Sequence, residues 1–340
     1  MNKQYTVYLC PTNRCNLKCK HCYHSIVDSK TTISQQRLLN DVYNWLTKFA
    51  DDHKDYDILI HLHGGEILQY DVKTIKQLIV KLRQYSNQFK FAITTNLVCK
   101  LTDDIIELFN QIDDKIIQTS WDYKIRFAND KQYQLWQDNV KQLNQSFIVQ
   151  PTICLTKHVI SDLKPADIYD LMISLGCNRL NFERITNTGR AETKQYTPSN
   201  YDLNVWMVEA FKVYQQYKHQ QKLVDLPLFD SIIKSVKGEL IGCRARKCSE
   251  YVRTINPDGT IATCPNTCSI AVDCIDHSTD SQTSKHIQLI KKEQIRTTSC
   301  LSCQYFIYCN GDCWQLQQSS VDDHTMCHGP LLIYQYLLGG

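Results

Sequence analysis

The sequence of 340 residues contains no apolar stretch near the length of about 20 residues that a membrane span needs. Its start, MNKQYTVYLC, lacks the apolar region of a signal peptide. No basic run is longer than a few residues, and the net charge is only +3, so charge does not indicate a nucleic-acid partner. No internal repeat or low-complexity segment is present. These absences predict a cytoplasmic globular protein without a membrane or nucleic-acid partner.

Cysteine is the residue type that this ordinary composition does not explain. Of the 17 cysteines, three lie in the segment 15–22 and ten lie in the segment 243–327. Without an export signal they do not indicate a disulfide framework, because the cytosol keeps thiols reduced, and metal binding is the better interpretation. The other four lie in apolar contexts, where a small buried hydrophobic role is expected: Cys10, Cys99, Cys154 and Cys177.

Short apolar runs alternate with amphipathic stretches from residue 5 to about residue 185. The runs are β-branched or aromatic and mostly end at polar or glycine residues, which is typical of strands. The predicted strands are 5–10, 58–63, 89–95, 116–121, 147–155 and 179–185. The predicted helices between them are 34–50, 73–86, 102–113, 131–145 and 164–176.

This alternation predicts an α/β fold with a parallel sheet and helices outside it, closed as a partial (β/α)6 barrel of the TIM type. Chemistry in such barrels gathers at the carboxyl ends of the strands. The three-cysteine loop follows the first predicted strand, and Gly64-Gly65-Glu66 follows the second. Both are therefore expected on one face of the barrel.

Three segments are expected along the chain. Residues 1–222 form the barrel domain and end in a long amphipathic stretch, 198–220. Residues 223–239 form a linker. Residues 240–340 form a small domain held together by metal, with one hairpin whose turn is Pro257-Asp258-Gly259.

The loop CNLKCKHCY places Cys15, Cys19 and Cys22 in a C-x3-C-x2-C spacing followed by Tyr23. Three thiolates suit a four-iron cluster in which one iron lacks a protein ligand, because cubane clusters normally take four cysteines. The alternative is a closed zinc or ferredoxin-type site with a fourth cysteine, for which Cys10 is nearest. The loop and the Gly-Gly-Glu turn together resemble the radical S-adenosylmethionine (SAM) superfamily.

This resemblance implies that SAM binds the open iron and yields a 5′-deoxyadenosyl radical after a one-electron reduction. Gly64, Gly65 and Glu66 would then contact the methionine amino group of SAM, with Tyr23 beside the cluster. Ile67 departs from the proline that many members have after this turn, which puts the local turn geometry in question.

Further SAM contacts are expected at the end of the fourth strand. Ser120 and Asp122 are candidates there, and a plain strand-end turn is the alternative for both. Arg126 is a third candidate. The catalytic base is not identified, and the residues considered for it are Asp122, Tyr123, Glu183, His61 and His63. For the two histidines, which alternate on a buried strand, a structural role is equally expected.

The second cysteine field resembles the SPASM extension of radical SAM peptide-maturing enzymes, which holds two auxiliary four-iron clusters. Carried over by position, the resemblance implies one auxiliary cluster on Cys243, Cys248, Cys264 and Cys313. It implies the other on Cys300, Cys303, Cys309 and Cys327. The alternatives are a pair of structural zinc sites, and substitution of a ligand by Cys268 or Cys274.

The resemblance therefore implies SAM and three [4Fe-4S] clusters as cofactors. It favours an enzyme that oxidatively cross-links or similarly modifies a short ribosomally made precursor peptide. Pro265 stands where anaerobic sulfatase-maturating enzymes have an aspartate base, which lowers the expectation of that activity. The alternatives are a dehydrogenase or epimerase of a small metabolite, such as a sugar or aminocyclitol, and an electron carrier or zinc-held binding module.

Two further partners are expected. The first is an electron donor such as flavodoxin or ferredoxin. Because the first cluster ligand is Cys15, no leader-binding domain of about eighty residues precedes it in this sequence. A separate leader-binding protein, or direct binding at the barrel mouth, is therefore expected to capture the peptide.

Overall fold

One curved sheet of nine strands organises the protein, in the order β6-β5-β4-β3-β2-β1-β7-β8-β9. The computed structural model describes residues 3–26, 30–267, 270–276, 282–319 and 326–339. The strands are β1 Lys3–Leu9, β2 Tyr56–Leu62, β3 Phe89–Thr95, β4 Ile116–Trp121, β5 Ile148–Leu155, β6 Asn181–Arg184, β7 Val252–Ile255, β8 Thr260–Ala262 and β9 Asp273–Cys274.

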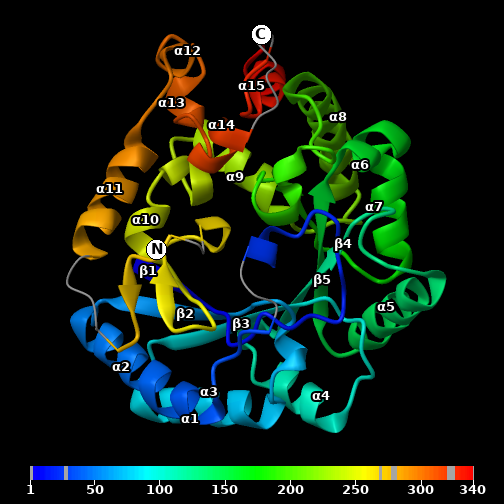
Figure 1. Ribbon diagram of the computed structural model, residues 1–340. Coiled ribbons are helices and arrows are strands. Elements are labelled where there is room, and N and C mark those ends of the chain that lie inside the picture. The colour runs from blue at the N-terminus through cyan, green and yellow to red at the C-terminus, as the bar shows by residue number, and fades with distance from the viewer. Residues whose placement is uncertain (1–2, 27–29, 268–269, 277–281, 320–325, 340) are drawn as a thin grey trace.

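Strands β1 to β6 pair side by side in parallel, and helices connect them. Figure 1 shows these helices on the outer side of the curved sheet. The predicted α/β partial barrel is therefore confirmed. The α-helices are α1 Gln35–Arg37, α2 Tyr43–Asp52, α3 Val72–Tyr85, α4 Asp103–Asn110, α5 Asp130–Leu143, α6 Lys157–Asp162, α7 Pro165–Ser174, α8 Asn200–His219, α9 Pro227–Val236, α10 Cys248–Tyr251, α11 Gln282–Gln294, α12 Thr298–Leu301, α13 Phe306–Cys309, α14 Trp314–Ser319 and α15 Leu331–Leu338.

The two faces of the sheet differ in polarity because side chains alternate along each strand. Val7, Leu9 and Ile60 are fully buried and belong to the apolar core. The intervening residues form a polar row on the other face. The ring of Tyr8 stacks on His61 at 4.9 Å, and His61 Nε2 lies 2.7 Å from Thr94 Oγ1. This face of the sheet therefore presents polar side chains.

The C-terminal part joins the same sheet. Strand β7 pairs in parallel with β1, and the β7–β8 pair is the antiparallel hairpin expected around Gly259, whose φ is +93°. Residues 223–239, expected as a linker, contain the helix α9. The boundaries of the predicted domains stay a prediction. Among the described residues, no helix is both long and apolar enough to cross a membrane.

Candidate active site

The cysteine loop and the Gly-Gly-Glu turn are joined directly through their backbones. The amide of Gly65 donates to the carbonyl of Thr12 at 2.9 Å, and the amide of Glu66 donates to Arg14 at 2.8 Å. The two motifs follow β1 and β2, which are adjacent parallel strands, so their carboxyl ends meet at one edge. The expectation that the motifs share one face holds in the structure.

Glycine is required in this turn because the loop lies so close. A Cβ added at Gly65 would lie 2.4 Å from the carbonyl oxygen of Asn13. At Gly64 it would lie 2.6 Å from Thr12 O, and the φ of +134° is a backbone conformation that side chains rarely adopt. Both glycines therefore allow the turn to pack against the cysteine loop.

The carboxylate of Glu66 is buried and held by the end of β3. One oxygen accepts from the Thr95 hydroxyl at 2.6 Å and the other from the Asn96 amide at 2.7 Å. Glu66 also accepts from Leu68 N at 3.1 Å, which caps the short 3-10 turn Ile67–Gln69. The Ile67 position is thus compatible with an ordered turn. Burial raises the pKa of Glu66, and these hydrogen bonds oppose that shift.

The same network reaches the first cysteine. The Asn96 side-chain amide donates to Asn16 Oδ1 at 2.7 Å and lies 3.8 Å from the sulfur of Cys15. Cys15 also interacts electrostatically with Cys19 and Cys22 of the same loop. Burial raises the pKa of Cys15 to about 11, which disfavours the thiolate. A bound metal would favour the thiolate again, because it coordinates that form.

Arg190 lies across the other side of the loop. Its guanidinium donates to the carbonyl of Cys19, and its amide donates to the carbonyl of Cys22, both at 3.1 Å. Arg190 belongs to the 3-10 turn Gly189–Thr193, which follows β6. The loop is therefore positioned both by β1, which it follows, and by the turn after β6, which carries Arg190.

Asp122 and Arg126 form a buried ion pair at the end of β4. Asp122 also lies 3.3 Å from His21 Nε2 and accepts from Cys154 N at 3.1 Å. Burial raises the pKa of Asp122, but Arg126 and then His21 outweigh it, so the pKa lies well below its usual range. Arg126 interacts electrostatically with Cys19, which places this positive group beside the cysteine loop.

The other candidates around the barrel mouth are dispersed. Ser120 pairs in register with Thr152 on β5 and is half-buried. Tyr123 is also half-buried, with Lys124 Nζ 4.8 Å from its ring centre. Glu183 is accessible to water, yet the surrounding protein raises its pKa, and its charge acts on Tyr8 inside the barrel.

Tyr23 contacts the histidine cluster. Its hydroxyl lies 3.3 Å from Nε2 of His63. Burial lowers the pKa of His61 to about 3 and that of His63 to about 4, with His63 adding to the effect on His61. Both rings are therefore neutral at ordinary pH. His61 is held by Thr94, as expected for a structural histidine.

The eight cysteines predicted for the auxiliary clusters fall into the two predicted sets. Cys243 interacts with Cys248 and Cys313, and Cys264 interacts with Cys313. In the second set, Cys327 interacts with Cys300 and Cys303, and a Cβ added at Gly329 would lie 3.1 Å from Cys309 Sγ and 3.8 Å from Cys327 Sγ. The structure brings the members of each set together, and their role as ligands stays a prediction.

Cys274 has a different neighbour. Its thiol donates to the carbonyl of Gly259 at 3.2 Å within the hairpin. This contact favours a structural role over substitution for an auxiliary ligand. Cys268 lies outside the described residues.

Comparison with known proteins identifies the fold. No protein-family model matches the chain. A curated relative, the serine-type anaerobic sulfatase-maturating enzyme of Bacteroides thetaiotaomicron, is 22% identical over 368 residues, covering 95% of this chain and 86% of the relative. The solved structure of native anSMEcpe with bound AdoMet matches with a TM-score of 0.79 at 15% identity, covering 98% of this chain and 96% of that one. The chain has the fold of a radical SAM enzyme.

A second structure of the same fold is Streptococcus suis SuiB bound to precursor peptide SuiA. It matches with a TM-score of 0.64 at 16% identity, covering 95% of this chain and 76% of that one. These likenesses span nearly the whole chain, including the cysteine-rich C-terminal part. They confirm the resemblance to radical SAM enzymes with a SPASM extension.

The donor sets of this radical SAM fold suit iron–sulfur clusters. Thiolates favour zinc or iron–sulfur centres. The loop offers three thiols, beside the carboxylate of Glu66 and the guanidinium of Arg126. Each C-terminal set offers four. The residues present therefore fit one cluster with an open coordination position and two closed ones.

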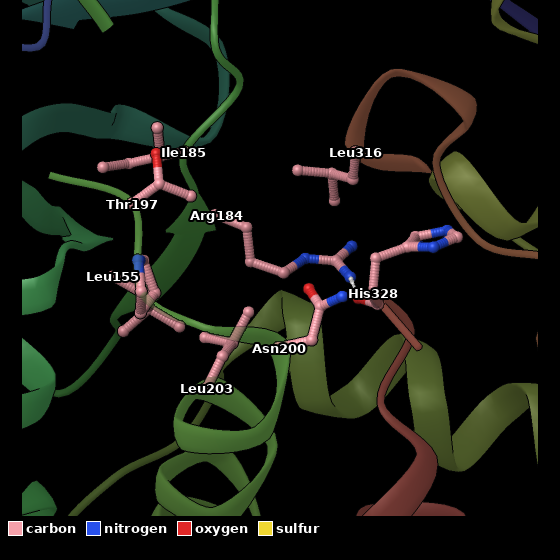
Figure 2. A pocket seen from close by; sticks show the side chains of 9 residues that line it. Leu155, Arg184, Ile185, Thr197, Asn200, Leu203, Leu316 and His328 are labelled. Carbon is pink, nitrogen blue, oxygen red and sulfur yellow. Dashed lines mark hydrogen bonds between the residues drawn. The ribbon is translucent and has the colours of Figure 1, made fainter. Parts of the chain in front are cut away.

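Several functional side chains carry no sequence signal. Arg184, at the end of β6, forms a buried ion pair with Asp312 between two predicted ligands. Figure 2 shows its guanidinium reaching His328, whose carbonyl accepts from Nη1 at 3.2 Å. Glu293 accepts from the amides of Cys248 and Ser249, each at 2.9 Å. Arg184 lies 128 residues from Asp312 and 144 residues from His328. Glu293 lies 45 and 44 residues from its two amide partners, so no local sequence motif could reveal these contacts.

Proposed function

We propose that this chain is a radical SAM enzyme that removes hydrogen from a peptide and so forms a cross-link or a similar modification. The observation that carries the proposal is the direct contact of the three-cysteine loop with the Gly-Gly-Glu turn. Adjacent strand ends hold the thiols, the Glu66 carboxylate and the Asp122–Arg126 pair around one mouth. This is the donor set that an open cluster and a zwitterionic cofactor would require.

Cys15, Cys19 and Cys22 would hold the SAM-binding [4Fe-4S] cluster. When bound, this cluster and SAM together supply a 5′-deoxyadenosyl radical that takes a hydrogen atom from the substrate. The backbone beside Gly65 and Glu66 would orient the amino group of SAM, and Arg126 would pair with its carboxylate. Tyr23, which directly follows Cys22, would lie beside the cluster.

Net oxidation removes two hydrogens from the peptide. One leaves as a hydrogen atom, which forms 5′-deoxyadenosine. The other leaves as a proton, for which we infer Glu183 as the acceptor, because the surrounding protein raises the pKa of its carboxyl group. The two C-terminal cysteine sets would hold auxiliary clusters, which would supply an acceptor for the remaining electron. A flavodoxin or ferredoxin supplies the electron that cleaves SAM.

A peptide substrate is supported by two solved structures of this fold. One is described as native anSMEcpe with bound AdoMet and Cp18Cys peptide, and it covers 98% of this chain. The other is SuiB with its precursor peptide. For this chain we infer a short precursor peptide that binds at the barrel mouth, alone or with a separate leader-binding protein.

The test is anaerobic reconstitution with iron and sulfide, followed by reductant, SAM and candidate peptides encoded beside the gene. Mass spectrometry is expected to detect 5′-deoxyadenosine and a peptide lighter by two hydrogens. A variant with alanine at Cys15, Cys19 and Cys22 should form neither product. Deoxyadenosine without a change in any peptide would contradict the peptide assignment but not the radical chemistry.

Sulfatase maturation is the second candidate, because the curated relative carries that activity in its name. Pro265 and Asn266 follow Cys264, where the family resemblance predicts an aspartate base. We therefore infer that a sulfatase peptide is the less favoured substrate. Incubation with a serine- or cysteine-containing sulfatase peptide and an aldehyde-reactive hydrazide separates the two functions, because only formylglycine gives the hydrazone.

A further inference from the structure

Cys10, His24 and His63 form a buried cluster beside the proposed active site. One ligand atom from each residue lies within 4.8 Å of the other two. Cys10 is fully buried, and His24 is 6% exposed. The imidazole rings of His24 and His63 are 5.4 Å apart between centroids and tilted by 31°. A thiol and two imidazoles therefore converge on one point.

The histidines have ring nitrogens that the protein does not satisfy. Within the described part of the chain, neither nitrogen of His24 has a hydrogen-bond partner, and Nδ1 of His63 has none. A buried polar atom without a partner is costly, and native structures rarely keep several together. A bound ion would satisfy one nitrogen of each ring at once.

The backbone holds the cluster in place. The amide of Cys10 donates to Ile255 of β7 at 3.0 Å, and the amide of His63 donates to Leu9 of β1 at 2.9 Å. The Tyr23 hydroxyl lies 3.3 Å from Nε2 of His63, so Nδ1 is the ring nitrogen that remains available to an ion. Metal-binding histidines are usually oriented by such a partner on the other nitrogen.

We propose that Cys10, His24 and His63 bind one zinc ion, at a site distinct from the three iron–sulfur clusters. Thiolate and imidazole are the ligand types that zinc prefers, and it accepts them in a tetrahedral arrangement. A set of three protein ligands leaves the fourth position for water or for a polar group of the substrate, which is typical of zinc sites that act on a ligand.

A second buried group of the same size shows why this one is preferred. His21, Asp122 and Cys154 also bring three ligand atoms within 4.8 Å. There, Asp122 is already paired with Arg126, whose positive charge opposes a cation. The site on Cys10 combines two incompletely satisfied rings with a thiol.

The experiment uses the holoenzyme with its iron–sulfur clusters, dialysed without oxygen against zinc and then against zinc-free buffer. X-ray absorption at the zinc edge reports only on zinc. The expected spectrum contains one sulfur at about 2.3 Å and two nitrogens at about 2.0–2.1 Å. Zinc surrounded by sulfur alone, or no retained zinc, would overturn the proposal.

Variants locate the ion. Cys10→Ser and His63→Gln should each lower the zinc affinity by at least about tenfold, and so the zinc retained after dialysis, since even changing a residue that only supports a ligand costs metal sites about 10- to 100-fold in affinity. Iron content should stay unchanged, which separates this site from the clusters. Cys177→Ser is the matched control because Cys177 is an equally buried thiol elsewhere in the chain. Equal zinc in all four proteins would contradict the assignment, as would zinc loss in the control.

Discussion

Arg184 and Asp312 form a buried two-point ion pair that joins the end of the barrel to the C-terminal cysteine segment. Nη2 donates to Oδ1 at 2.8 Å and Nη1 donates to Oδ2 at 3.2 Å. The side chains are 8% and 0% exposed. Because Asp312 directly precedes Cys313, this pair positions a predicted ligand relative to β6.

Arg184→Ala should lower the free energy of unfolding by about 3–5 kcal/mol, because it leaves a buried carboxylate without its partner. Urea unfolding under anaerobic conditions measures this. Arg37→Ala is the control, since Arg37 and Asp41 form a pair with side chains 39% and 42% exposed. Its cost should stay within about 0–1 kcal/mol. Equal costs for the two variants would contradict the structural role of Arg184.

Gly65→Ala should weaken both SAM binding and the retention of the loop cluster. The added Cβ would lie 2.4 Å from Asn13 O and 2.6 Å from Arg14 O, so the loop backbone must move. Stability should fall by about 1–3 kcal/mol. Gly238→Ala is the control, because its φ is +86° but nothing lies within 4 Å of the new atom. It should cost stability without affecting SAM; an unaltered SAM affinity in Gly65→Ala would show that the contact is dispensable.

Replacing Cys15, Cys19 and Cys22 together by alanine should remove about a third of the iron, since one of three four-iron clusters is lost. Iron and sulfide analysis of the anaerobically purified protein measures this. Cys177→Ala, a buried thiol outside the predicted sets, should retain all of it. Unchanged iron in the triple variant would refute the assignment of the loop.

Arg126→Ala should raise the dissociation constant of SAM about 10- to 100-fold, the value of a hydrogen bond to a charged group. Calorimetry without reductant measures binding apart from cleavage. Lys124→Ala is the matched control two residues away, since Lys124 is 55% exposed and pairs with Asp162 instead. If both variants bind SAM like the wild type, Arg126 is not a SAM contact.

Cys264→Ser should lose an auxiliary cluster, whereas Cys274→Ser should keep it. Burial, followed by the interaction with Cys313, raises the pKa of Cys264 to about 12 and marks it as part of the first set. Cys274 instead donates to Gly259. Iron analysis of both variants measures which one has lost a cluster. Iron loss in Cys274→Ser but not in Cys264→Ser would identify Cys274 as the ligand instead.

The sequence predicted most of the fold because strand and helix patterns are local. Strands β3 and β4 have the predicted bounds, and the predicted edges of β1 and β2 differ from the structure by one or two residues. The six-residue helix α6 was not predicted, because it is too short to show helical periodicity over a full window.

The candidate site was predicted only where residues are close in sequence. The cysteine loop and the Gly-Gly-Glu turn carry their own spacing, and the order of the strands places them together. Thr95 and Asn96 carry no such signal. They support Glu66 only because β3 ends beside β2 in the sheet.

The sequence by itself determined the chemical inventory, which consists of thiols in spaced groups, a Gly-Gly-Glu turn and an alternating α/β pattern. Each of these features depends only on residues that are close together in the sequence. Only the tertiary structure decided which buried groups lie together. Arg184 meets Asp312 across 128 residues, and Cys10 meets His24 and His63, because folding brings segments that are distant in sequence into contact.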